Sequence, residues 1–240
     1  MLYHSLVMQK VVIAGLSPEW PSPLDLELGM KEVLLLEGLG WEEGEAFWRV
    51  ASSLDTPLEG EVLYWGRSVT HLLRPEVFRL RRQVAYISPG QVLLQHLTLQ
   101  ENITLAICYR RSLSVSQALK GQQGLLERLA LTPYLSWKPR QLSHDVAWRG
   151  QLAGQLIQKP ELILAFLDGP GLSMVNQSIL LEVLTDYIAR NQGAVFLAGR
   201  ALDAFHPLAH RLLRVEAGHF VETHLLEHRE RSPVDFFPLV

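Results

Sequence analysis

The sequence predicts an α/β fold built around a parallel β-sheet. Short apolar runs alternate with amphipathic stretches along much of the chain, and this alternation is typical of strands joined by crossover helices. The run ELILAFLDG (161–169) is almost entirely apolar and ends in an acid and a glycine, as expected of a central parallel strand. The first part of the chain carries several strand patterns and the middle is helical. We therefore expect a β-rich start and a helical insert.

In the first half, prolines at 18, 21 and 23 separate the early strands. A helix is expected after the glycines near position 40, because Phe47, Val50 and Ala51 recur at helical spacing. The expected elements are strands at 6–16, 24–28, 31–39 and 60–66, a helix from Glu45 to about Leu54, a helical turn at 74–83, a strand at 84–87, and helical structure from Leu97 to about Arg140 with a polar break at 110–117.

In the second half, strand and helix patterns alternate up to a closing pair of strands. The expected elements are a helix at 149–158, the strand at 161–169, a helix at 176–191, a strand at 193–199, a short helix and two strands within 210–222. One domain is expected over residues 1–240, with a core at 1–92 and 150–225, a helical subdomain at 93–149 and a tail at 226–240.

Composition narrows the class of protein. At 240 residues with 48% hydrophobic content, the chain can fill a large core. A net charge of −3 argues against a nucleic-acid partner, which would need a basic face. Cys108 is the single cysteine, which excludes an internal disulfide framework and fits a reducing compartment. The N-terminal residues lack signal-peptide features and no apolar run approaches the roughly 20 residues of a membrane span, so a soluble cytosolic protein is expected.

The stretch LLLEGLGWEEGEAFWRV (34–50) has the layout of a phosphate-binding loop. An apolar strand ends in glycines and an amphipathic helix follows, which places backbone N–H groups and a helix N-terminus where a phosphate could sit. However, the loop carries Glu42, Glu43 and Glu45 and no lysine. One of these acids could cap the helix in place of a phosphate.

Four further segments, in this order, resemble the nucleotide-binding subunit of ATP-binding cassette (ABC) transporters. They are DTPLEGEVLYWGRSV, FRLRRQVAYI followed by HLTLQENITL, PRQLSHDVAWRGQLAGQLIQKPELILAFLDGP, and LAHRLLRVEAGHFVE. With the glycine loop, the resemblance covers nearly the whole chain. It implies the ABC-type P-loop NTPase fold, with a β-rich N-terminal part, a parallel-sheet core and a helical subdomain insert. The family's activity would be ATP hydrolysis.

The family's functional positions are altered in this sequence. In the phosphate loop, Gly38 and Gly40 remain. Either Gly44 or Glu45 stands where the resemblance implies the lysine. The residue after it, Glu45 or Ala46, stands where the resemblance implies the hydroxyl that binds magnesium. In the signature, Leu142 and Ser143 are kept but His144-Asp145-Val146 follow, and in the Walker B region Asp168 is kept but Gly169 stands where the resemblance implies the catalytic glutamate. The other altered positions are Pro89 or Gln91 in the glutamine loop, Met174 and Val175 in the loop after the Walker B strand, and Arg200 at the switch histidine.

These departures predict a non-hydrolysing cassette subunit, a structural or regulatory partner in a membrane transport complex. We expect no catalytic residue, no metal site and no cofactor, with a transmembrane permease and possibly a second, competent cassette as partners. The 90–114 region matches the surface on which the family holds its permease, and the location expected is the cytoplasmic face of the inner membrane. Alternatives are an active but divergent ATPase that uses Asp168, with ATP and Mg²⁺, or a free-standing regulatory protein. The helical stretch LTLQENI also resembles lipid-trafficking importers.

Four other motifs have competing interpretations. Gly38-x-Gly40 could begin a dinucleotide loop, but its third glycine is misplaced. His224 to His228 matches a zinc-protease motif, although a solvated helix face is favoured. The three arginines at 79, 81 and 82 could bind phosphate, and the aromatics at 41, 47 and 48 could belong to the core or to an interface.

Overall fold

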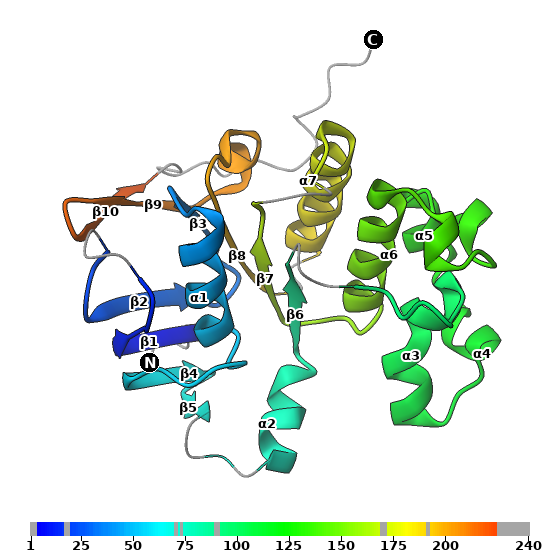
Figure 1. Ribbon diagram of the computed structural model, residues 1–240, viewed down its shortest axis with the longest axis horizontal. Coiled ribbons are helices and arrows are strands. Elements are labelled where there is room, and N and C mark those ends of the chain that lie inside the picture. The colour runs from blue at the N-terminus through cyan, green and yellow to red at the C-terminus, as the bar shows by residue number, and fades with distance from the viewer. Residues whose placement is uncertain are drawn as a thin grey trace.

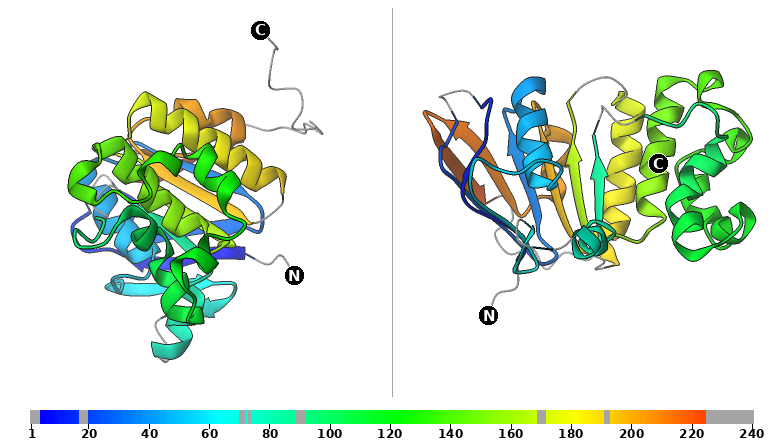
Figure 2. Two further views of the ribbon diagram at one scale, coloured as in Figure 1. Left: turned by 90° about the vertical axis from the view of Figure 1, so that its right-hand side faces the viewer. Right: turned by 60° about the horizontal axis from the view of Figure 1, so that its bottom comes forward.

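The computed structural model describes residues 4–16, 20–69, 72, 74–88, 92–168, 172–190 and 193–224. The chain folds into two β-sheets on one side and a group of helices on the other (Figure 1). Views from other directions show the same separation between the sheets and the helical end (Figure 2). No helix within the described ranges is long and apolar enough to cross a membrane.

The smaller sheet is antiparallel and has the strand order β2-β1-β4-β5. Its strands are β1 (His4–Val12), β2 (Leu24–Gly29), β4 (Glu59–Tyr64) and β5 (Arg67–Ser68). In β2 the residues alternate strictly between buried and exposed, because successive side chains of a strand point to opposite faces and only one face meets the core. β1, β2 and β4 overlap the strands expected at 6–16, 24–28 and 60–66, whereas β5 was not expected and the strand expected at 31–39 belongs to the larger sheet.

The larger sheet has the order β10-β9-β3-β8-β7-β6, parallel except for the terminal β9–β10 pair. Its strands are β3 (Val33–Glu37), β6 (Val84–Ile87), β7 (Leu162–Phe166), β8 (Ala194–Gly199), β9 (Arg211–Glu216) and β10 (His219–His224). Every residue of β3, β7 and β8 is buried. Their continuous apolar runs follow from this position, since both faces of the sheet are covered.

One core layer lies between the two sheets and encloses helix α1 (Trp41–Ala51) (Figure 1). Alternate residues of the central strands point into it, including Leu36, Leu164 and Phe166, and they meet Phe47 and Trp48 of α1. Both of these α1 aromatics are fully buried. The sequence left open whether they belonged to the core or to an interface, and the structure places them in the core.

The opposite face of the large sheet supports the second core layer. Strand residues such as Leu35, Ala165 and Leu167 point into it. The helical elements on this side and beyond it are α3 (Leu99–Arg111), α4 (Val115–Leu119), α5 (Gln123–Arg128), the short 3₁₀ helices η2 (Thr132–Tyr134) and η3 (Pro139–Gln141), α6 (His144–Leu156), α7 (Met174–Ala189) and η4 (Asp203–Leu208), and α2 (Arg74–Arg81) precedes β6.

The start of α3 shows how local sequence sets these helices. The Thr98 side chain accepts from the N–H of Glu101, and the Glu101 carboxylate accepts from the N–H of Thr98, which is a complete capping box. The Thr98 hydroxyl also donates to the Glu101 carboxylate, and this bond, with the one from the Thr98 N–H, lowers the pKa of the Glu101 carboxyl. The helix ends inside the polar break expected at 110–117, since α3 stops at Arg111 before a left-handed Ser112.

Candidate functional site

The glycine loop after β3 is shorter than a phosphate loop requires. Gly38, Leu39 and Gly40 alone separate β3 from α1, which begins at Trp41. The predicted helix start at Glu45 is therefore wrong. The residues expected to wrap a phosphate instead form the first turn of the helix, so their N–H groups point along the helix axis and do not surround an anion.

The first N–H groups of this loop already have an acceptor. The backbone N–H groups of Gly38 and Leu39 donate to the carbonyl oxygen of Gly199, at 3.0 and 3.3 Å. Gly199 ends β8, the neighbour of β3. The loop is therefore held against the sheet by its own backbone.

The acids of the first turn do not cap the helix as the sequence suggested. Gly40 is the N-cap residue, and it has no side-chain cap hydrogen bond. Glu43 accepts a hydrogen bond from the indole N–H of Trp20, at 3.1 Å. Glu42 lies exposed in the same turn, where a negative charge is favoured by the helix dipole. The prediction that an acid caps the helix is therefore wrong: Glu43 binds the Trp20 indole, and Glu42 interacts only with the helix dipole.

Gly44, one of the two positions for the absent lysine, is buried against an aromatic ring. A Cβ atom on Gly44 would overlap the ring of Phe166, the last residue of β7. Trp41 and Trp48 also pack on this ring, with centroids 6.1 and 6.3 Å away. Phe166 is 1% exposed. The space in front of Gly44 is thus filled by the protein's own core, and a lysine there would have to displace Phe166.

The alternative lysine position, Glu45, faces solvent. Its side chain is exposed and lies within electrostatic reach of Arg49 and Tyr86. Ala46, next along the chain, is half-buried against the core between the sheets. On either count, no cation from α1 is directed at the glycine loop.

Asp168 and Arg200 do come together beside the loop. The Arg200 guanidinium lies 3.4 Å from the Asp168 carboxylate and close to Gly40, 3.9 Å from the place of a Cβ atom there. The Arg200 side chain is 70% exposed, so the ion pair contributes little to stability. Asp168, which the resemblance placed in the Walker B region, is therefore paired with Arg200, which it placed at the switch histidine.

Phe166, which no sequence motif indicated, lies against the first turn of α1. Strand alternation places Phe166 on the α1 side of β7 and Leu167 on the opposite side, so the side chain that β7 directs at the start of α1 is apolar. The sequence contained a signal in the alternation of the strand ELILAFLDG, whose even-numbered residues share the face that meets α1.

The signature residues lie at the start of α6, apart from the glycine loop (Figure 1). Ser143 is the N-cap of α6, and its hydroxyl accepts from the N–H of Val146 at 3.4 Å. Leu142 precedes it and is half-buried. Asp145 accepts from the hydroxyl of Ser173, the N-cap of α7, at 2.8 Å. These residues join two helices, a structural role. Pro89, Gln91 and Gly169 lie outside the described residues.

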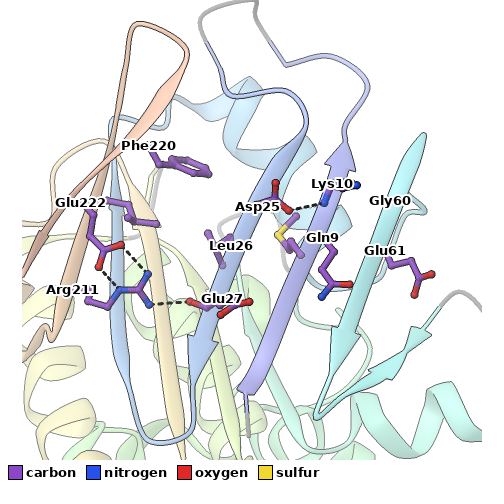
Figure 3. A pocket seen from close by; sticks show the side chains of 12 residues that line it. Gln9, Lys10, Asp25, Leu26, Glu27, Gly60, Glu61, Arg211, Phe220 and Glu222 are labelled. Carbon is purple, nitrogen blue, oxygen red and sulfur yellow. Dashed lines mark hydrogen bonds and ion pairs between the residues drawn. The ribbon is translucent and has the colours of Figure 1, made fainter. Parts of the chain in front are cut away.

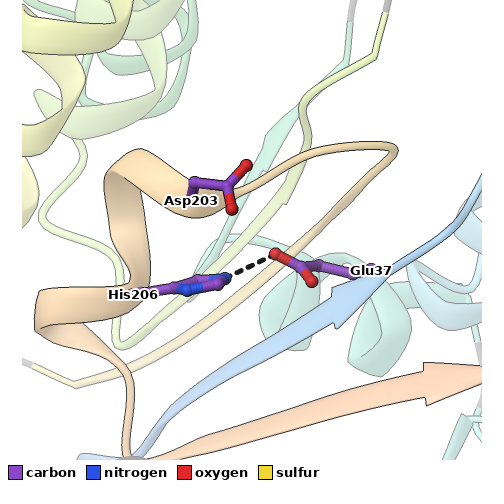
Figure 4. A group of neighbouring side chains, drawn as sticks. All are labelled: Glu37, Asp203 and His206. Atoms are coloured by element: carbon purple, nitrogen blue, oxygen red, sulfur yellow. Dashed lines mark hydrogen bonds and ion pairs between the residues drawn. The ribbon is translucent and has the colours of Figure 1, made fainter.

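A second charged cluster lies at the end of β3 (Figure 4). Glu37, 7% exposed, accepts from His206 at 2.5 Å and from Arg214 at 2.9 and 3.0 Å. Burial raises the pKa of the Glu37 carboxyl, but the bonds from His206 and Arg214 outweigh it and hold the pKa below 4.5. Asp203 completes a set of possible metal ligands within 4.8 Å. Because both oxygens of Glu37 already have donors, the cluster is explained as an ion-pair network joining β3, η4 and β9.

A cavity of about 710 Å³ opens between the edge of the small sheet and β9–β10 (Figure 3). Arg211 crosses it and pairs with Glu222 at 2.6 Å and with Glu32 at 3.0 Å. The hydrogen bond to Glu222 is the largest cause that raises the pKa of Arg211. Partial burial lowers this pKa, and the bond to Glu32 raises it further, so the net shift is upward. None of the site residues expected from the sequence lines this cavity, so it is not the expected nucleotide site.

A groove of about 620 Å³ lies between α3 and α6. Exposed apolar side chains border it, including Val92, Leu94, Leu105 and Tyr109, with exposures of 82, 42, 45 and 91%. One side of the groove, between Val92 and Tyr109, falls within the 90–114 region in which the sequence placed a permease-binding surface, and residues 150–158 form the other side.

Known proteins resemble this chain in both sequence and structure. The arginine transport ATP-binding protein ArtP of Escherichia coli strain K12 is 29% identical over 207 residues, which cover 83% of each chain. The lipoprotein-releasing system ATP-binding protein LolD of Myxococcus xanthus is 32% identical over 143 residues, 59% of this chain and 62% of LolD. The chain matches no protein-family model.

Among solved structures, the ATP-binding cassette MJ0796 bound to ADP and phosphate matches 93% of this chain and 100% of its own, with a TM-score of 0.80 and 20% identity. An ATP-binding subunit of an ABC transporter matches 94% of this chain, with a TM-score of 0.75 and 22% identity. The chain has the fold of an ATP-binding cassette. This confirms the fold class expected from the sequence, and the sequence relatives are ATP-binding subunits of transporters.

Three other groups of residues singled out in the sequence lie elsewhere in the fold: the arginines near the end of α2, the motif that begins at His224, and Trp41. Arg79 and Arg82 are exposed, whereas Arg81 donates to the carbonyl of Ser53. The zinc-protease motif starts at His224, the last residue of β10, and its other residues lie outside the described part of the chain. Trp41 is 37% exposed, at the start of α1.

Proposed function

We propose that this cassette is a non-hydrolysing subunit of an ABC transport complex, a structural or regulatory partner of a membrane permease. The observation that carries the proposal is the packing of Phe166 against Gly44. Phosphoryl transfer depends on groups that position a phosphate and neutralise its charge. In this chain the corresponding place holds an aromatic ring.

Electrostatics supports the same conclusion. Glu42 and Glu43 lie in the first turn of α1, the end of the helix that a nucleotide phosphate would approach. Two like charges about 4 Å apart repel by roughly 4 kcal/mol at an effective dielectric of 20. Each 1.4 kcal/mol changes a dissociation constant about tenfold, so one such contact would convert micromolar binding into millimolar binding. No lysine on α1 offsets it.

The proposed partner is a permease that docks in the groove between α3 and α6. Leu105 and Tyr109 are exposed on α3, and exposed apolar patches of this kind mark interaction sites. The relatives named above are ATP-binding proteins of transport systems, which favours this partner over a free-standing regulator. A second, competent cassette would supply the ATP hydrolysis in such a complex, and the proposed location is the cytoplasmic face of the membrane.

Steady-state ATPase measurements on the purified protein test the proposal. We expect no turnover above that of an Asp168→Ala variant, because Asp168 is paired with Arg200 and no general base accompanies it among the described residues. Co-purification with the permease should persist in nucleotide-free buffer that contains a metal chelator. Turnover within tenfold of an ordinary cassette, abolished by Asp168→Ala, would support the rival function of a divergent active ATPase.

A further inference from the structure

Arginines lie at the ends of α2 and α3, both of which are on the lower side of the molecule in Figure 1. We define the basic rim as Phe78, Arg79, Arg82, Tyr109, Arg110 and Arg111. Burial lowers the pKa of Arg110, and repulsion from Arg111 and Arg82 lowers it further. That repulsion places Arg82, just after α2, within electrostatic reach of the end of α3.

The arginines of the basic rim are not neutralised by neighbouring acids. Within the described ranges, no ion pair joins any of the four to a carboxylate. Arg128 and Arg190, by comparison, both pair with Asp186. Cations near a helix C-terminus interact favourably with the helix dipole. That interaction explains the arginines at the end of each helix, but it does not explain why arginines of two different helices lie near one another. Their mutual repulsion is a cost that an external anion would relieve.

Exposed aromatic side chains accompany these charges. Phe78 is 56% exposed and Tyr109 is 91% exposed. Each directly precedes an arginine in the sequence. Aromatic rings beside cations are typical of surfaces that meet the headgroup region of a membrane, where the ring lies among apolar chains and the cation meets phosphate.

The basic rim also borders the groove between α3 and α6, because Tyr109 lines that groove. Both α2 and the end of α3 lie on the lower side of the molecule in Figure 1. α2 leads into the start of β6, whereas the glycine loop follows the carboxyl end of β3. The basic rim and the glycine loop are thus separate surfaces.

We propose that the basic rim binds the anionic headgroups of the phospholipid bilayer next to the groove. Opposite charge favours this occupant, since four unpaired arginines meet a surface of phosphate groups. The inference rests on the proposed function for its location, because a permease in the groove would bring the rim to the membrane. Lipid binding itself can be measured without a permease or nucleotide, so the two proposals can fail separately.

Vesicle co-sedimentation tests the inference on the purified full chain. We expect binding to vesicles that contain about one third phosphatidylglycerol and little binding to pure phosphatidylcholine. Each arginine near an anionic surface strengthens binding about fivefold, so the triple variant Arg82→Gln, Arg110→Gln, Arg111→Gln should bind roughly 100-fold more weakly. Phe78→Ala should weaken binding at high salt, where the charges are screened.

The matched control removes three exposed cations elsewhere on the helical end, Lys120, Lys138 and Arg140, each changed to Gln. It has the same net charge as the triple rim variant and should bind like the wild type. Equal losses in both variants, or no preference for anionic vesicles, would overturn the inference. It would also be overturned if the rim variant bound vesicles normally but lost the permease in detergent, because the rim would then recognise an acidic protein segment.

Discussion

The ring of Phe166, at the end of β7, occupies the space that any side chain on Gly44 of α1 would need. This contact locks the carboxyl end of a central strand to the first turn of the helix that follows the glycine loop. Position 44 therefore requires glycine because the Phe166 ring lies close to its backbone, and not because the chain turns there. The same contact makes Gly44 and Phe166 part of the core between the sheets.

A double-mutant cycle tests this packing. Gly44→Ala should destabilise the protein by about 1–3 kcal/mol, the usual cost of overpacking a core, when measured by urea unfolding. In a Phe166→Leu background the same change should cost clearly less, because a flexible side chain replaces the rigid ring. Equal costs in the two backgrounds would mean that Gly44 and Phe166 do not interact.

The network around Glu37 should make stability depend on pH. Glu37→Gln should cost about 1–3 kcal/mol at pH 7, since it weakens the bonds to His206 and Arg214. Folding lowers the pKa of Glu37, so its contribution is present above the ordinary value of 4.5 and is lost as the pH falls through the lower folded pKa.

The measurement is the free energy of unfolding of both proteins between pH 7 and pH 3. The difference between wild type and Glu37→Gln should be constant above about pH 5 and should shrink below pH 4.5. Asp203, nearby, is the control: Asp203→Asn leaves the bonds to Arg214 intact and should preserve the shift. A difference that grows as the pH falls would contradict the sign of the pKa change.

The two acids in the first turn of α1 should behave differently. Glu43→Ala removes the acceptor of the Trp20 indole and should cost about 1.5–3 kcal/mol, as for a bond to a charged group. Glu42→Ala removes only a favourable dipole interaction, about 0.3–1 kcal/mol at low ionic strength. Thermal melts at low and high salt separate them, since only the Glu42 effect should fade with salt. Equal, salt-sensitive losses would show that both acids act through the dipole.

Permease docking should depend on the groove between α3 and α6. Leu105→Asp places a charge on its exposed apolar border and should reduce co-purification with the permease at least tenfold, because the buried charge would lack a partner. Leu58→Asp, at an exposed apolar residue that does not line the groove, is the control and should leave the complex intact. Retention of the complex by Leu105→Asp would place the interface elsewhere.

The sequence predicted the fold well because its central strands β3, β7 and β8 are continuously apolar and alternate with helical patterns. The parallel run 161–169 and the closing pair of strands carried that information. The start of α1 could not be predicted in the same way. The family pattern predicts a loop up to position 44, whereas the helix begins at Trp41. Its first turn packs on Phe166, which fills the space beside Gly44.

The candidate site was predicted only in part. Gly40, Asp168 and Arg200 were identified from motif order, and the structure brings them together. Phe166 and the Glu37 network were missed, because both depend on which face of a strand a residue occupies and on partners distant in sequence. His206 and Arg214 follow Glu37 by 169 and 177 residues, and no local pattern links them.

Calorimetric titration of the purified wild-type protein with Mg-ATP tests the central claim most directly. Because Phe166 fills the space beside Gly44 and two acids occupy the first turn of α1, we predict no saturable heat up to millimolar nucleotide. Thermal melting in the same buffer should show no upward shift, whereas a site filled at a hundredfold excess would stabilise the protein by about 2.7 kcal/mol. Saturable binding in the micromolar range, with a matching shift in melting temperature, would contradict the account.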